Sequence, residues 1–264
     1  MNNIFIEGIQ GSGKSTLLNQ LQKRLPDYKA YREGDLSPVE LAWCSYMTIQ
    51  QYEKVCNRYQ DIASEIEAHT ATEGDKKITA YTQILTDIPG FHKSMEEYEI
   101  YNGRVSYPEF KDIIFRRYSS FQGNGNIFEC SFFQNSIECM MLFYQMSEKE
   151  IKDFYLEAYE LLKSKNFRLL YLDVKDVALT IETIRKERVD TKGNELWYPL
   201  MIRYLSESPF GKAHNLKNFH GLIYHLKRRM KLEKSILDLI GKDVLVLDSK
   251  NYEMDNIIHW CGSR

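Results

Sequence analysis

The residues best suited to chemistry form one short run, Gly8-Ile9-Gln10-Gly11-Ser12-Gly13-Lys14-Ser15, which fits the pattern of a phosphate-binding loop. Its glycines allow backbone N–H groups to converge on an anion, because they have no side chain and tolerate positive φ angles. Lys14 would reach the β- and γ-phosphates, Ser15 would offer its hydroxyl to Mg²⁺, and Thr16 would add a donor. The run therefore predicts a nucleotide site formed by Gly8, Gly11, Ser12, Gly13, Lys14, Ser15 and Thr16.

The residues on either side of this run supply the elements that such a loop requires. Residues 3–7 are strand-like, and leucines recur at helical spacing from Lys14 to Leu25, after which Pro26 ends the helix. The positive end of that helix dipole would point at the phosphates. A glycine-rich turn that binds no ligand is the alternative, and the strand before and helix after the run argue against it.

Composition excludes several other classes of protein. The chain has 264 residues, 43% apolar content and a net charge of −2, which indicates a sizeable core and no field that would attract a nucleic acid polymer. Its densest basic run, Lys227-Arg228-Arg229, is predicted to be a solvated helix face. Five cysteines without a Cys-x-x-Cys pair suggest neither a disulfide framework nor a thiolate zinc site. We expect a cytoplasmic protein with reduced cysteines and with no signal peptide, membrane span or nucleic acid partner. The sequence leaves open whether the protein forms a homodimer.

Strand-like and helical segments alternate along the chain, which predicts an α/β fold with a doubly wound parallel sheet of about five strands. The strand-like runs are residues 3–7, 28–33, 126–129, 167–174 and 243–248. Within one domain covering residues 1–264, a helical acceptor-binding insertion is predicted at 36–125 and a lid region at 180–218. In the insertion, Pro38 is expected to open a helix and residues 70–77 to form a loop.

The order of these features resembles the P-loop kinases of nucleosides, nucleotides and small metabolites, the deoxynucleoside kinase and thymidylate kinase group. In that group the second strand ends in a Glu near a Pro-x-x-x-Trp stretch, and here Glu33 is followed by Pro38 and Trp43. The third strand of the group often ends in Glu-Arg-Ser, whereas this one ends in Glu129-Cys130-Ser131. The arginine is absent, and its replacement would have to be Arg104, Arg116 or Arg117.

The same resemblance implies a lid helix whose arginines close over the nucleotide. Arg185 and Arg188 occupy the matching place after the fourth strand. Because they stand three residues apart, one helical face can present both to a phosphate.

Phosphoryl transfer also needs a carboxylate that orients or deprotonates the acceptor. Glu33 is the predicted base, and Asp35 in the same loop is the alternative base or a ligand of Mg²⁺ through water. A solvated loop acid remains the structural alternative for Glu33. Glu129 ends a buried strand, where an ionised carboxylate needs a partner, so we expect a contact to a metal, its water or the acceptor, with a helix N-cap as the alternative.

The acceptor pocket is expected to come from residues 36–145, where aromatic residues alternate with amides and arginines. Such residues suit a stacked, hydrogen-bonded planar acceptor such as a nucleobase, although each aromatic could equally be part of the core. The predicted acceptor-binding residues are Trp43, Tyr46, Arg104, Glu129 and Gln134.

The sequence thus predicts a phosphotransferase that uses ATP and Mg²⁺ and acts on a small-molecule acceptor. The favoured acceptor is a nucleoside or nucleotide, and the alternative is an antibiotic or other metabolite. The rival class is a nucleotide-driven switch without transfer, supported only by Asp87-Ile-Pro-Gly90, which mimics the Asp-x-x-Gly of GTPases. No guanine-reading Asn/Thr-Lys-x-Asp segment follows it, so this run is predicted to be a turn.

Overall fold

The computed structural model describes residues 1–262, and the contacts within the chain divide it into two compact units. Unit 1 comprises residues 1–30 and the chain from Gln122 onward, and unit 2 comprises residues 31–121. The predicted phosphate-binding loop lies in unit 1, and the predicted insertion falls largely in unit 2.

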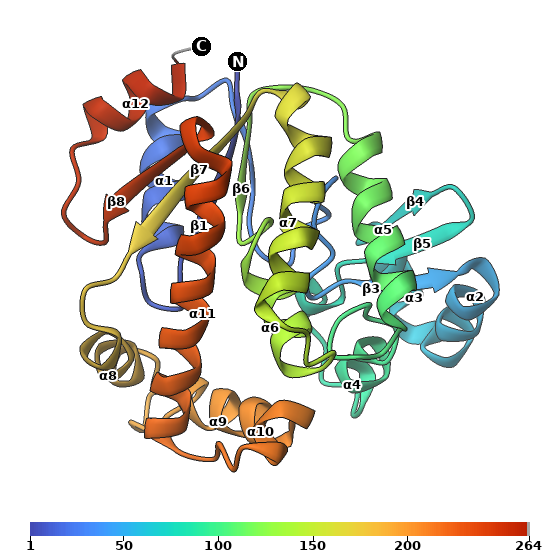
Figure 1. The fold of residues 1–264 in the computed structure, drawn as a ribbon. Helices are drawn as coiled ribbons and strands as arrows, with labels where there is room; N and C mark the ends of the chain where they lie inside the picture. Colours follow the sequence, from blue (N-terminus) through green and yellow to red (C-terminus); the bar gives the residue numbers. More distant parts are fainter. Residues whose placement is uncertain (263–264) are drawn as a thin grey trace. The chain divides into compact units, whose positions relative to one another are not determined.

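Unit 1 is built on a five-stranded parallel sheet flanked by helices, which confirms the predicted α/β class (Figure 1). The strand order is β2-β6-β1-β7-β8, and the second strand is shorter than the predicted 28–33. The strands are β1 Asn3–Glu7, β2 Lys29–Tyr31, β6 Asn126–Glu129, β7 Phe167–Asp173 and β8 Val244–Asp248. The helices are α1 Lys14–Arg24, α6 Gln134–Leu142, α7 Glu148–Leu162, α8 Val177–Glu187, α9 Trp197–Glu207, α10 Pro209–Ala213, α11 Phe219–Ile240 and α12 Met254–Gly262.

The central strand β1 is buried along its whole length, and its side chains alternate between the two faces of the sheet. Ile4 and Ile6 pack in a cluster with residues of α1 and α12. On the opposite face, Phe5 contacts Phe132, which in turn contacts Tyr155 of α7. Helices thus cover both faces, and the loop that follows β1 emerges at the carboxyl edge of the sheet, where ligands of such folds bind.

Unit 2 combines helices with a three-stranded antiparallel sheet of order β3-β5-β4, so "helical insertion" describes only part of it. Residues 70–77 were wrongly predicted to be a loop, because they belong to the hairpin of β4 and β5, with Gly74 at φ 59° in its two-residue turn. Its elements are β3 Ser45–Thr48, α2 Ile49–Arg58, α3 Ala63–Ala68, β4 Thr70–Glu73, β5 Lys76–Thr79, α4 Phe91–Glu96 and α5 Tyr107–Ser120, with short 3₁₀ turns at Gln60–Ile62 and Tyr81–Gln83.

The helix predicted to open at Pro38 does not form. The Glu40 carboxylate accepts the backbone N–H groups of Leu41, at 2.7 Å, and Ala42, at 2.8 Å. A side chain that binds nearby N–H groups in this way competes with the helical pattern. The segment therefore runs as turns into β3.

Within residues 1–262, no helix combines the length and the apolar character needed to cross a membrane.

Candidate functional site

The glycine-rich loop follows directly from the carboxyl end of β1. Gly8, Gly11 and Gly13 have φ angles of 142°, 80° and 97°, which other L-residues rarely adopt. A Cβ atom on Gly8 would also approach the carbonyl oxygen of Leu172 to 2.8 Å. Backbone conformation and close packing therefore both require glycine in this loop.

Helix α1 begins at Lys14, immediately after the loop. No side chain caps its N-terminus, and its first turn contains no acidic residue, so its N–H groups and its dipole favour an anion. Lys14 is 7% exposed, and its ammonium group donates to the carbonyl oxygens of Gly8, at 2.9 Å, and Ile9, at 3.0 Å. The loop thus holds one cation against its own main chain.

The other predicted loop residues, Ser12 and Thr16, have different surroundings. Ser12 is fully buried, and the Ser249 hydroxyl donates to its carbonyl oxygen at 2.7 Å. No partner among the described residues reaches the Ser12 hydroxyl. Thr16 is exposed in the first turn of α1. Main-chain and hydroxyl groups therefore remain at this loop for an anionic ligand.

Ser15 and Glu129 meet beside the loop, because the Ser15 hydroxyl donates to Oε1 of Glu129. Glu129 is the last residue of β6 and pairs in register with Ile6 of the neighbouring strand. Cys130 follows it with φ 57°, a strained conformation of the kind found at functional sites. A hydroxyl and a carboxylate are oxygen ligands that suit Mg²⁺, so this pair fits the predicted metal site.

Glu7, which the sequence analysis did not select, lies at the base of the loop. It is 0% exposed, and its two carboxylate oxygens accept the N–H groups of Phe132, at 2.6 Å, and Gln134, at 3.3 Å. Burial raises its pKa to about 7, which the bond from Phe132 and the Lys14 charge only partly offset. A charged residue that ends an apolar strand directly before the loop was the available sequence signal. Gln134, which was predicted to bind the acceptor, contacts Glu7 through its backbone N–H.

The two arginines predicted to belong to a lid lie at the end of α8, which packs on the loop. A Cβ atom on Gly11 would lie 2.7 Å from Ile184 and 3.0 Å from Thr180, so α8 contacts the loop directly. Arg185, one residue further, pairs with Glu195 and lies 4.2 Å from the ring centre of Tyr198.

Arg188, the C-cap of α8, lies 5.4 Å from the ring centre of Trp197. A short backbone bridge between Val189 and Glu195 closes the turn that follows. Both predicted lid arginines therefore contact the segment that leads into α9.

The predicted base and its alternative share one loop of unit 2. Glu33 is partly buried. The Asp35 carboxylate accepts the N–H of Arg32, at 2.7 Å, and the amide of Gln83, at 2.7 Å. These bonds give Asp35 a structural role in shaping the loop. The assignment of Glu33 as the base stays a prediction.

Two neighbouring residues of unit 2 carry unusual features. Glu40 is buried, and Oε1 accepts the hydroxyl of Tyr101 in addition to the two backbone bonds described above. Burial raises its pKa to about 7, and the nearby charge of Glu33 adds to that shift. Trp43 has φ 59° and is 49% exposed, so a large aromatic side chain is presented from a strained backbone. Only Trp43 was selected from the sequence.

The other predicted acceptor residues of unit 2 are engaged with nearby side chains. Tyr46 in β3 lies under the ammonium group of Lys76, 5.7 Å from its ring centre. Arg104 pairs with Glu96 at 2.5 Å.

The two arginines considered as replacements for the missing strand-end arginine are paired as well. Arg116 pairs with Asp112 at 2.9 Å. Arg117 is buried, pairs with Glu73 and donates to the carbonyl oxygen of Ser37. Together with Arg104, all three candidate replacements already have carboxylate partners.

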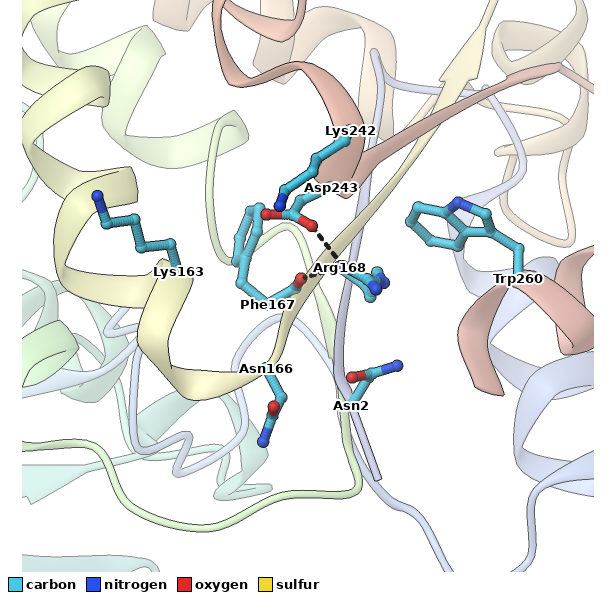
Figure 2. A pocket seen from close by; sticks show the side chains of 8 residues that line it. All are labelled: Asn2, Lys163, Asn166, Phe167, Arg168, Lys242, Asp243 and Trp260. Carbon is cyan, nitrogen blue, oxygen red and sulfur yellow. Dashed lines mark hydrogen bonds and ion pairs between the residues drawn. The ribbon is translucent and has the colours of Figure 1, made fainter. Parts of the chain in front are cut away.

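A pocket of about 690 Å³ lies elsewhere in unit 1, and Figure 2 shows the side chains that line it. Asn2 precedes β1, Arg168 lies at the start of β7, and Asp243 precedes β8, so the pocket is at the amino edge of the sheet. Arg168 pairs with Asp243 there and lies 5.4 Å from the ring centre of Trp260. This pocket is therefore distinct from the predicted phosphate site, which lies at the carboxyl edge of the same sheet.

The structure brings the glycine loop, Lys14, Ser15, Glu129 and α8 together in unit 1, while Glu33, Trp43 and Tyr46 belong to unit 2. No protein-family model matches the chain, and no curated protein matches it. Its function has to be inferred from these residues.

Proposed function

We propose that the protein is an ATP- and Mg²⁺-dependent phosphotransferase that transfers the γ-phosphate to a hydroxyl group of a small molecule. The observation that carries the proposal is the contact between Ser15 and Glu129 beside the glycine loop. A glycine loop alone would suit any anion, whereas a hydroxyl and a buried carboxylate beside it suit a metal-bound polyphosphate.

The residues of unit 1 would divide the binding of the nucleotide. The loop N–H groups and Lys14 would hold the phosphates, and Ser15 and Glu129 would hold Mg²⁺, which neutralises charge on the transferring group. Arg185 and Arg188 would add positive charge after leaving their partners in the lid. Glu33 would orient the acceptor hydroxyl and accept its proton.

Charge distribution favours an acceptor without phosphate. Residues 31–121 contain 15 Asp or Glu and 10 Lys or Arg, whereas the rest of the chain contains 22 and 25. An anionic acceptor would meet repulsion from unit 2, and Arg104, Arg116 and Arg117, the three arginines considered above, are paired with Glu96, Asp112 and Glu73. We therefore propose that the acceptor is a nucleoside-like compound with a free hydroxyl group and not a nucleotide. The alternative acceptor is a hydroxyl group of an antibiotic or other metabolite.

The test is ADP formation from Mg-ATP by the purified protein with nucleosides, nucleoside monophosphates and hydroxylated antibiotics. Lys14→Ala protein, purified in parallel, controls for contaminating kinases. ADP and a phosphorylated product that appear only with a nucleoside would support the proposal. Activity with monophosphates alone would shift the acceptor group to a phosphate. Steady hydrolysis without any acceptor, or a preference for GTP, would favour the switch class.

A further inference from the structure

A buried cluster of charged and polar side chains, to which none of the roles above is assigned, lies in unit 1. We call it the Arg229 cluster, and it consists of Glu138 of α6, Tyr171 of β7 and His225, Arg229 and Glu233 of α11. Arg229 is 0% exposed. The run 227–229 was predicted to be a solvated helix face, and for Arg229 this was wrong because α11 turns it toward the sheet.

The cluster gives both carboxylates a partner on each oxygen. Arg229 donates to Glu138 at 2.8 Å and to Glu233 at 2.7 Å. The remaining Glu138 oxygen bonds His225 at 2.6 Å, and the remaining Glu233 oxygen accepts the Tyr171 hydroxyl at 2.7 Å. Burial opposes the charge of Arg229, but the two carboxylates raise its pKa well above the ordinary value. Arg229 is therefore a fixed buried cation.

Arg229 also reaches the glycine loop. Its Nη2 donates to the carbonyl oxygen of Gly8 at 3.4 Å, and its Nη1 donates to the side-chain oxygen of Gln10 at 3.3 Å. The Gly8 carbonyl is the same oxygen that accepts the ammonium group of Lys14. Two buried cations thus share one main-chain oxygen at the first turn of the loop.

A purely structural role would not need this arrangement. Well-packed apolar residues of similar volume often stabilise a core as well as a buried ion pair does. A planar guanidinium group carries five N–H donors in a fixed fork, so Arg229 can satisfy two carboxylates and still direct donors at a third place. The contacts with Gly8 and Gln10 are what an apolar replacement could not provide.

We propose that Arg229 is a positioning residue for the phosphate-binding loop, acting through Gly8 and Gln10. To reach a phosphate, Lys14 has to leave the carbonyls of Gly8 and Ile9. Arg229 then keeps a charged donor on the Gly8 oxygen and holds the Gln10 side chain, so the loop N–H groups stay directed at the nucleotide. The inference depends on the proposed nucleotide site of unit 1 and does not depend on the acceptor.

The experiment is a titration of the full chain with Mg-ATP and Mg-ADP, measured by calorimetry, for wild type, Arg229→Lys, Gln10→Ala and the double variant. Arg229→Lys retains the charge but loses the forked geometry, and we expect Kd to rise about tenfold, the loss typical of a hydrogen bond to a charged group. Gln10→Ala should raise Kd less, and the double variant should be less than additive because both changes act on one contact. Arg168→Lys is the matched control, because Arg168 is another arginine of unit 1 that pairs with a carboxylate, and it lies at the amino edge of the sheet, away from the glycine loop.

Thermal unfolding of the same variants separates positioning from stability. Arg229→Lys and Arg168→Lys should both lower the unfolding temperature, but only the former should raise Kd. A Kd that is unchanged in both Arg229→Lys and Gln10→Ala, or effects of the two that simply add, would overturn the positioning role. If Arg229→Lys does not fold, an unchanged Kd in Gln10→Ala overturns it alone. Wild-type protein that binds neither nucleotide would overturn the proposed function, and with it this inference.

Discussion

Unit 1 and unit 2 differ in their balance of charge, with 22 acidic and 25 basic residues outside 31–121 and 15 and 10 within it. In unit 1 the cations Lys14 and Arg229 are buried around a main-chain loop, and the basic residues outnumber the acidic ones. In unit 2 the buried groups include the carboxyls Glu40 and Glu99, whose pKa values burial raises to about 7. Unit 1 therefore suits an anion, whereas unit 2 suits a polar group without negative charge.

The two units also differ in whether the main chain or side chains form their candidate binding residues. The predicted phosphate-binding loop depends on main-chain conformation, because three glycines close together in the sequence adopt positive φ angles. The polar residues of unit 2 come from distant positions, as the bond from Tyr101 to Glu40 shows. The following changes test whether the two units have separate roles.

Lys14→Ala should have the largest effect, because it removes the cation from the nucleotide site. A cation held against a transferring phosphoryl group is worth on the order of 10³-fold in rate, so kcat/KM should fall by about that factor. Nucleotide titration and steady-state kinetics measure the loss. Lys23→Ala, an exposed change on the same helix, is the control and should leave both unchanged.

Glu33→Gln should spare nucleotide binding and lower kcat by about 10²–10³, the range expected for loss of a general base. Pre-steady-state measurement of product formation isolates the transfer step from nucleotide release. Turnover equal to that of wild type would remove the assignment to Glu33 and leave Asp35 as the carboxylate to test.

The sequence predicted unit 1 more closely than unit 2, for a physical reason. Strands buried on both faces, such as residues 167–173, are continuous apolar runs that need no knowledge of their neighbours. The hairpin at 70–79 has alternating polar residues and one Gly-Asp turn, a pattern shared with loops. Its strand pairing depends on contact with β3, which local sequence does not specify.

The site follows the same rule. Lys14, Ser15 and the loop glycines were identified because their spacing is fixed by one turn of backbone. Arg229 is 221 residues from Gly8, and neighbouring basic residues made it resemble a surface position. Its role depends on which face of α11 meets the sheet, and that becomes visible only in the structure.

Trp43→Ala should act on the acceptor side alone. Stacking of a base on an aromatic side chain is worth about 1–3 kcal/mol, so the acceptor KM should rise at least about fivefold while the KM for ATP stays constant. Trp260→Ala is the matched control, because it removes a tryptophan from the pocket at the amino edge of the unit 1 sheet, away from the glycine loop. An equal rise in the KM for ATP after Trp43→Ala would contradict the division of roles between the units.

The last change should affect stability and leave activity largely unchanged. It concerns two buried carboxyls whose pKa values are raised alike but whose hydrogen bonds differ. Burial raises the pKa of both Glu7 and Glu40 to about 7. Both oxygens of Glu7 accept backbone N–H groups. In Glu40, all the described bonds end on Oε1, so Oε2 can carry a proton without losing a bond.

Glu40→Gln mimics the protonated carboxyl, because the amide oxygen can take the bonds of Oε1. Since the folded pKa lies above its ordinary value of about 4.5, the wild-type carboxyl contributes its stability below about pH 4.5 and loses it as the pH rises through about 7. The substitution should therefore have little effect at pH 5 and raise the free energy of unfolding by about 3 kcal/mol at pH 8, since each unit of pKa is worth about 1.4 kcal/mol. Glu7→Gln should destabilise at pH 5, because its amide group cannot accept one of the two N–H bonds. Denaturant unfolding at both pH values measures this, and equal effects of the two substitutions would show that burial alone, rather than the bonding of each unit, sets the cost of these charges.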